Sequence, residues 1–165
     1  MNAVSTMRPE SLRQFVLSLG DKPRSFPTWN IFGDLITPII TGRETAGGLV
    51  ILDAVIPPKH GPPLHVHHRE DEAFYVVEGR FLYECGDRRA EGGPGTYVFL
   101  PRDLPHCFQN IGDTAGRMVA ICQPAGIESF FEQVSAIQGP PDPAKIGPIA
   151  QTLGLELLGP PMAMR

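Results

Sequence analysis

The chain has 165 residues, of which 42% are hydrophobic and 19% charged, values typical of one globular domain with a full core. Its formal net charge is -4, with 14 basic and 18 acidic residues, and the scattered basic residues argue against nucleic acid as a partner. No apolar stretch approaches the length of a transmembrane helix, and residues 1–8 lack the order of a signal peptide. We therefore expect a cytoplasmic protein without a membrane partner.

The first predicted element is a short amphipathic helix, because apolar residues recur at helical spacing over residues 12–19. We assign residues 1–27 to an N-terminal arm that contains this helix. The β region then begins near Trp29, with a turn at Gly33 and Asp34.

The middle of the chain, residues 28–125, reads as a series of short strands. Residues 48–56 are rich in β-branched residues and stop at two prolines, which predicts a long strand. Further apolar runs alternate with turns as far as Gln123. The sequence has no βαβ pattern, in which a helix connects two parallel strands. This organisation predicts an all-β fold, built as a closed or double-sheet barrel.

The carboxyl end, residues 126–165, changes to a helical period and is expected to be a helical extension. Its first helix carries an apolar stripe of Ile127, Phe130, Phe131, Val134 and Ile137. A second helix is expected to begin at Asp142 as N-cap with Pro143 in the first turn, and to close at Gly154. Because the stripe is more apolar than a lone barrel needs, we expect a homodimer.

Four of the five histidines lie within residues 60–68. On a strand, His65 and His67 project to the same side, and Glu72 opens the strand that returns after a polar turn. Two imidazoles and a carboxylate on one hairpin suit a first-row transition metal. The alternative is a set of solvated turn histidines, but strand spacing followed by a carboxylate favours the metal.

A fourth ligand is expected from His106, which follows a rigid corner at residues 101–105 and shares a strand face with Phe108 and Asn110. His60 and His68 are expected to lie outside the ligand set. Cysteines 85, 107 and 122 are odd in number and lack Cys-x-x-Cys spacing, so we interpret them as buried small residues.

Two sequence motifs connect these residues, Gly-x5-His-x-His-x3,4-Glu-x6-Gly and Gly-x5-Pro-x-Gly-x2-His-x3-Asn. The matching residues are His65, His67, Glu72 and Gly79 in the first, and Gly95, Pro101, His106 and Asn110 in the second. Gly61 lies two positions closer to His65 than the first motif asks, and Asp103 replaces a glycine of the second. The chain resembles the cupin superfamily, and within it small single-domain cupins similar to quercetin 2,3-dioxygenase.

The resemblance implies a jelly-roll barrel, here with short flanking helices. It also implies one divalent metal held by His65, His67, Glu72 and His106, with one or two positions left open. The metal is open among iron, nickel, manganese, cobalt, copper and zinc.

Strand parity with Glu72 and His106 predicts that Phe74, Val76 and Phe108 face the barrel interior and bind a small-molecule substrate. Tyr83 and Met118, whose facing strand parity does not fix, are added to this substrate-binding set. Such a lining suits an aromatic or apolar substrate, although plain barrel core has the same pattern. We expect a dioxygenase for an enolisable substrate, with Glu72 as ligand and proton acceptor. The alternatives are a non-catalytic metal or small-molecule binding cupin, and a metal-assisted isomerase.

Overall fold

The computed structural model describes residues 15–17 and 25–165. In chain order the elements are β1 (Trp29–Ile31), β2 (Asp34–Ile40), β3 (Val50–Ile56), β4 (Pro63–His67), β5 (Asp71–Glu78), β6 (Phe81–Cys85), β7 (Arg88–Gly92), β8 (Tyr97–Leu100), β9 (His106–Asn110), β10 (Gly116–Gln123), α1 (Glu128–Ser135), α2 (Pro143–Thr152), β11 (Leu155–Pro161) and the 3-10 helix η1 (Met162–Met164). The helix predicted for residues 12–19 falls outside the described residues, except for 15–17, which have no regular secondary structure.

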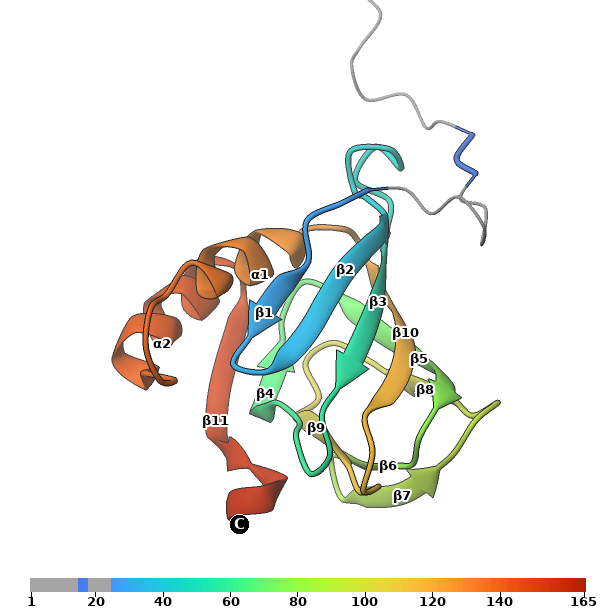
Figure 1. Cartoon of the computed structure of the whole chain (residues 1–165). Helices are drawn as coiled ribbons and strands as arrows, with labels where there is room; N and C mark the ends of the chain where they lie inside the picture. The colour runs from blue at the N-terminus through green and yellow to red at the C-terminus, as the bar shows by residue number, and fades with distance from the viewer. Residues whose placement is uncertain (1–14, 18–24) are drawn as a thin grey trace, which may run out of the picture.

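Two antiparallel sheets face each other and form a jelly roll, which confirms the predicted all-β fold (Figure 1). One sheet has six strands in the order β1-β2-β3-β10-β5-β8, and the other has five in the order β11-β4-β9-β6-β7. Strand β10 lies between β3 and β5, and β9 lies between β4 and β6. Neighbours so distant in the chain are typical of a jelly roll, in which strands cross between sheets.

The core lies between the two sheets. Every second residue of β3, from Val50 to Ile56, is buried, and β5 alternates in the same way from Glu72 to Val76. This alternation is the period of a strand that packs one face inward. Glu72, near the start of β5, therefore lies on the same inward face as Phe74 and Val76.

Both C-terminal helices form where the sequence predicts them. Helix α1 buries Val134, and Phe131 stacks on Trp29 of β1 with ring centroids 6.0 Å apart. Helix α2 begins at Asp142, whose side chain accepts a hydrogen bond from the Ala144 backbone N–H at 3.0 Å. In the described part of the chain, neither helix is long and apolar enough to cross a membrane.

The apolar stripe of α1 packs in part against the protein's own barrel, because α1 lies beside β1 (Figure 1). Ile127 and Val134 are buried, whereas Phe130, Phe131 and Ile137 are only partly buried. The stripe thus offers less free surface than the homodimer prediction assumed, and dimerisation stays a prediction.

The carboxyl end also contains a strand that the sequence did not reveal. After α2 the chain turns at Gly154 with φ +80° and continues as β11, which pairs antiparallel with β4. Residues 126–165 are thus not helical throughout. Because β4 carries two of the predicted ligands, this strand borders the candidate site.

Candidate metal centre

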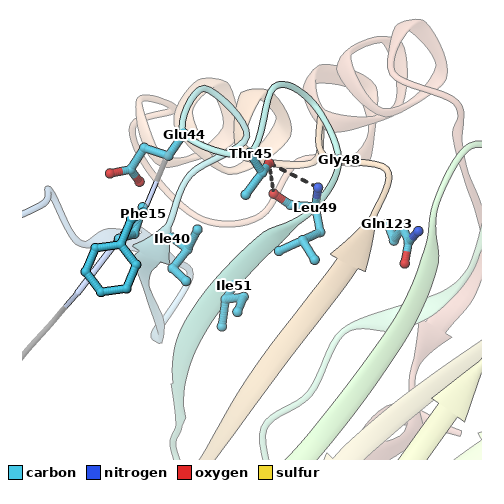
Figure 2. A pocket seen from close by; sticks show the side chains of 9 residues that line it. Phe15, Ile40, Glu44, Thr45, Gly48, Leu49, Ile51 and Gln123 are labelled. Carbon is cyan, nitrogen blue, oxygen red and sulfur yellow. Dashed lines mark hydrogen bonds between the residues drawn. The ribbon is translucent and has the colours of Figure 1, made fainter. Parts of the chain in front are cut away.

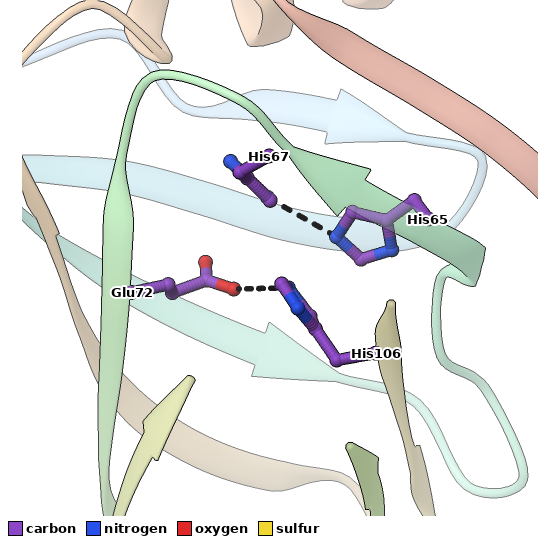
Figure 3. A group of neighbouring side chains, drawn as sticks. All are labelled: His65, His67, Glu72 and His106. Carbon is purple, nitrogen blue, oxygen red and sulfur yellow. Dashed lines mark hydrogen bonds and ion pairs between the residues drawn. The ribbon is translucent and has the colours of Figure 1, made fainter. Parts of the chain in front are cut away.

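Three strands and both sheets supply the four predicted ligands (Figure 3). His65 and His67 lie on β4, and His106 begins β9 directly opposite His65 in the register. Glu72 comes from β5 in the facing sheet and points toward the histidines. The jelly roll therefore brings together residues that are up to 41 positions apart in the chain, from His65 to His106.

The four side chains each offer one ligand atom, and these atoms all lie within 4.8 Å of one another. His65 Nε2 and His67 Nε2 are 3.1 Å apart, and His106 Nε2 is 3.5 Å from Glu72 Oε2. Three imidazole nitrogens and one carboxylate oxygen thus converge on a common point. The predicted grouping of His65, His67, Glu72 and His106 is what the structure shows.

Two of the rings are held by backbone carbonyls. His65 Nδ1 lies 2.8 Å from the Pro63 carbonyl oxygen, and His106 Nδ1 lies 2.8 Å from the Leu104 carbonyl oxygen. A carbonyl oxygen only accepts, so each Nδ1 carries the proton and donates it. The Nε2 lone pair of each ring is then free for a metal.

One buried nitrogen shows that a divalent ion fits this site. His106 is 1% exposed, and its Nε2 has no hydrogen-bond partner among the described residues. A buried polar atom without a partner costs about 1–3 kcal/mol, and a metal at the common point would satisfy it. The donor set, three imidazoles and a carboxylate, is one that zinc and neighbouring transition metals accept.

The environment sets two ligands in the protonation state that metal binding requires. Burial, with the nearby His67 and His106 rings, lowers the pKa of His65 to about 3. Burial alone would raise the pKa of Glu72, but the interactions with His106 and His67 outweigh it and lower that pKa to about 2. At neutral pH, His65 is therefore neutral and Glu72 is ionised.

These two shifts predict how acid affects the metal-free protein. The unfolded chain takes up a proton at His65 below about pH 6.5, whereas the folded chain does so only near pH 3. The Glu72 carboxylate acts with the same sign, between its ordinary pKa of 4.5 and its lowered pKa of about 2. The free energy of unfolding should thus fall from pH 6.5 downward, by at most about 1.4 kcal/mol per pH unit for each group.

Urea denaturation of the metal-free protein between pH 7.5 and 4.5 measures this slope. The variant His65→Asn, which has no titrating ring at this position, should show a shallower fall. Equal slopes for the two proteins would contradict the assignment of the lowered pKa to His65.

The other two described histidines of the cluster point away from the ligands, as predicted. His68 Nδ1 lies 2.7 Å from Asp103 Oδ1, and its Nε2 lies 3.4 Å from Glu156 Oε2. His60 Nδ1 lies 3.3 Å from Asp34 Oδ1. Asp103 has φ +62° at the position where the second motif has a glycine, a backbone conformation that aspartate adopts more easily than most residues.

All five side chains predicted to bind substrate are buried in the core between the sheets: Phe74, Val76, Tyr83, Phe108 and Met118. They pack against one another, with Phe74 and Phe108 ring centroids 5.2 Å apart. The Tyr83 hydroxyl donates to Met118 Sδ at 3.2 Å. The inward facing of Phe74, Val76 and Phe108 agrees with strand parity, and the structure places Tyr83 and Met118 in the same core. The role of these side chains in substrate binding stays a prediction.

A cavity of about 510 Å³ lies elsewhere, near the turn that precedes β3 (Figure 2). Its lining includes Ile40, Leu49, Ile51 and Gln123. None of the four candidate ligands or the five predicted substrate residues lines it. This cavity is therefore separate from the candidate metal centre.

The structure adds neighbours of the ligands that sequence reasoning missed. Leu155 and Leu157 of β11 stand opposite His67 and His65 in the register. Cys122 Sγ lies 3.7 Å from Glu72 Oε1, and Cys85 is the cross-strand partner of His106. The pairing of β10 with β5 places Cys122 opposite Glu72, so correct strand pairing would have found it.

Part of the chain around the candidate metal centre matches a known family model. Residues 52–122 match the family model described as the cupin domain. The matched range contains all four candidate ligands.

Two curated proteins are similar to about half of this chain. An uncharacterised protein of Methanocaldococcus jannaschii is 27% identical over 74 residues, which are 45% of this chain and 59% of that protein. The polyketide synthase CurC of Streptomyces cyaneus is 34% identical over 89 residues, 52% of this chain and 53% of that protein. The chain thus spans a little over half the length of these curated relatives.

One solved structure has a fold similar to that of this chain. KdgF from Halomonas sp. matches 70% of this chain and 98% of its own, with a TM-score of 0.60 and 15% identity. At this identity the likeness shows the fold alone. The site chemistry of this chain rests on its own residues.

Proposed function

We propose that the protein is a metal-dependent oxidoreductase of the dioxygenase type that acts on a small aromatic or enolisable substrate. The observation that carries the proposal is the convergence of three imidazole nitrogens and one carboxylate oxygen within 4.8 Å. A divalent ion held by His65, His67, Glu72 and His106 would act as a Lewis acid toward a substrate oxygen. Iron, nickel, manganese, cobalt, copper and zinc all accept such ligands.

The side chains next to the ligands support an apolar or aromatic substrate. Phe74 follows Glu72 on the inner face of β5, and Phe108 follows His106 on the inner face of β9. Tyr83 adds a hydroxyl whose bond to the Met118 thioether is weak. A carbonyl or enolate oxygen of a substrate would be a better acceptor for that hydroxyl.

The name of one relative supports an enolisable substrate. The CurC protein of Streptomyces cyaneus is named a polyketide synthase. Polyketide chains carry carbonyl groups on alternate carbons, so they enolise readily and offer two oxygens to one metal. The match covers about half of each chain, and it therefore bears on substrate class only.

The structure favours one of the two roles predicted for Glu72. A carboxylate whose pKa is lowered to about 2 is a weak base at neutral pH, because an efficient proton acceptor has a pKa near the working pH. The lowered pKa supports Glu72 as a metal ligand and speaks against Glu72 as proton acceptor. The substrate proton is then better released to solvent than to this residue.

Dioxygen uptake tests the proposal. Protein loaded in turn with each of the six metals is mixed with flavonols, catechols and β-diketones, and oxygen is followed with an electrode. We expect uptake with at least one pair, and one mole of oxygen per mole of product, because a dioxygenase places both oxygen atoms in its product and needs no external reductant. The Tyr83→Phe variant should raise KM more than it lowers kcat, since the hydroxyl is proposed to orient substrate.

The other outcomes point to the alternative functions. Binding of a test compound without oxygen uptake under any metal would replace the enzyme by a small-molecule binding protein. Conversion of a sugar or small organic acid without oxygen would favour a metal-assisted isomerase, and would show that the aromatic side chains are plain core.

A further inference from the structure

A buried acid, Glu70, lies in the turn between β4 and β5, two residues before Glu72. It is 3% exposed, whereas Arg69 beside it is exposed. A Cβ on Gly126 would lie 3.4 Å from Glu70 Oε1, so the loop after β10 passes directly over the carboxylate. A buried carboxylate is costly unless it is paired, yet Glu70 Oε2 has no hydrogen-bond partner among the described residues.

The group nearest to this oxygen belongs to a candidate metal ligand. His67 Nδ1 lies 3.5 Å from Glu70 Oε2, and both side chains are almost fully buried. Within the part of the chain that the structure describes, His67 Nδ1 also has no hydrogen-bond partner. A donor and an acceptor without other partners thus face each other slightly beyond ordinary hydrogen-bond length.

The other two histidine ligands, His65 and His106, show what a partner at Nδ1 does for a ligand ring. The Nδ1 atoms of His65 and His106 donate to backbone carbonyls two residues earlier in the chain, each at 2.8 Å. His67 has no such bond, and its Nδ1 faces Glu70 instead. We infer that Glu70 is a positioning residue for the metal centre: its carboxylate accepts the Nδ1 proton of His67 and keeps His67 Nε2 directed at the metal.

An anionic acceptor differs from a carbonyl in its effect. A carboxylate that accepts from the far nitrogen of a histidine ligand fixes the ring and increases the donor strength of the metal-binding nitrogen. With Glu72, Glu70 provides a second negative charge to balance a divalent ion. The first motif leaves position 70 unspecified, so this is a property of the chain's own residues. Glu70 has this positioning role whichever reaction the protein carries out.

Zinc affinity tests the inference without any activity measurement. Dissociation constants for Zn²⁺ are obtained at pH 7.5 by competition with a chromophoric chelator, for wild type, Glu70→Gln and Glu70→Ala. The matched control is Glu156→Gln, which makes the same chemical change at an exposed carboxylate beside His68. We expect zinc to bind about tenfold more weakly to Glu70→Gln, up to about 100-fold more weakly to Glu70→Ala, and unchanged to Glu156→Gln.

A second readout separates positioning from a purely structural role. The visible spectrum of the Co²⁺-loaded protein should change in Glu70→Gln, because the geometry and donor strength of His67 change, and it should stay the same in Glu156→Gln. A folded Glu70→Gln protein with wild-type zinc affinity and cobalt spectrum would overturn the inference, even if it were less stable. If Glu70→Ala does not fold, the nearly isosteric Glu70→Gln decides. Failure of wild type to bind zinc would instead contradict the metal centre itself.

Discussion

Replacement of His67 or Glu72 by alanine should leave the purified protein without its metal. Each change removes one of the four ligand atoms that converge within 4.8 Å, and in Glu72→Ala it also removes the carboxylate that balances the charge of the ion. The loss of affinity should exceed the roughly 10–100-fold that follows when an outer partner of a ligand is lost. Elemental analysis after desalting gives the metal content of each variant directly.

His68→Ala is the control for this experiment, because His68 is adjacent to a ligand in sequence but faces Asp103 and Glu156. It should retain close to the wild-type metal content. If His68→Ala lost as much metal as His67→Ala, the assignment of the ligands on β4 would be wrong.

The largest effect on stability is expected from Asn110→Ala. Asn110 is fully buried, and its side-chain amide donates to the carbonyls of Ile56, Pro57 and Thr114. Its Oδ1 accepts from the Gly112 backbone N–H at 2.9 Å. The loss of these hydrogen bonds, which leaves buried backbone groups unpaired, should lower the free energy of unfolding by roughly 3 to 5 kcal/mol.

Gln109→Ala provides the comparison for Asn110→Ala in urea denaturation. Gln109 is the neighbouring amide, and its side chain makes one hydrogen bond, to the Lys59 carbonyl at 3.0 Å in an exposed position. That variant should lose at most about 1 kcal/mol. Equal losses in the two variants would show that the final asparagine of the second motif does not have the structural role described here.

Strand periodicity predicted most of the barrel, because strands such as β3 and β5 bury every second residue. It failed for β7, where Arg88, Arg89 and Glu91 are exposed, so an apolar alternation is absent. It also failed for β11, whose Gly159 and Pro160 resemble a loop after a helix. Strands of this kind form through pairing with β6 and β4, which the local sequence does not reveal.

The metal ligands could be predicted because their spacing is visible in the sequence. Two histidines at strand spacing are followed by a carboxylate, and a third histidine follows a later proline-bounded turn. The reason for a glycine at position 61 is visible only in the fold, because a Cβ there would overlap the carbonyl oxygen of Phe108 on β9. Glu70 has no such pattern: its burial depends on the loop after β10, which is distant in sequence. Prediction of the residues that surround a ligand therefore required the folded structure.

Anomalous diffraction at the zinc absorption edge, from crystals of the zinc-loaded protein, tests the central claim most directly. We expect one peak per chain, enclosed by His65, His67, Glu72 and His106, at about 2.0–2.2 Å from the three Nε2 atoms and a Glu72 oxygen. A peak bound by His68 or His60, or a wild-type crystal with no peak between the two sheets at saturating zinc, would contradict it.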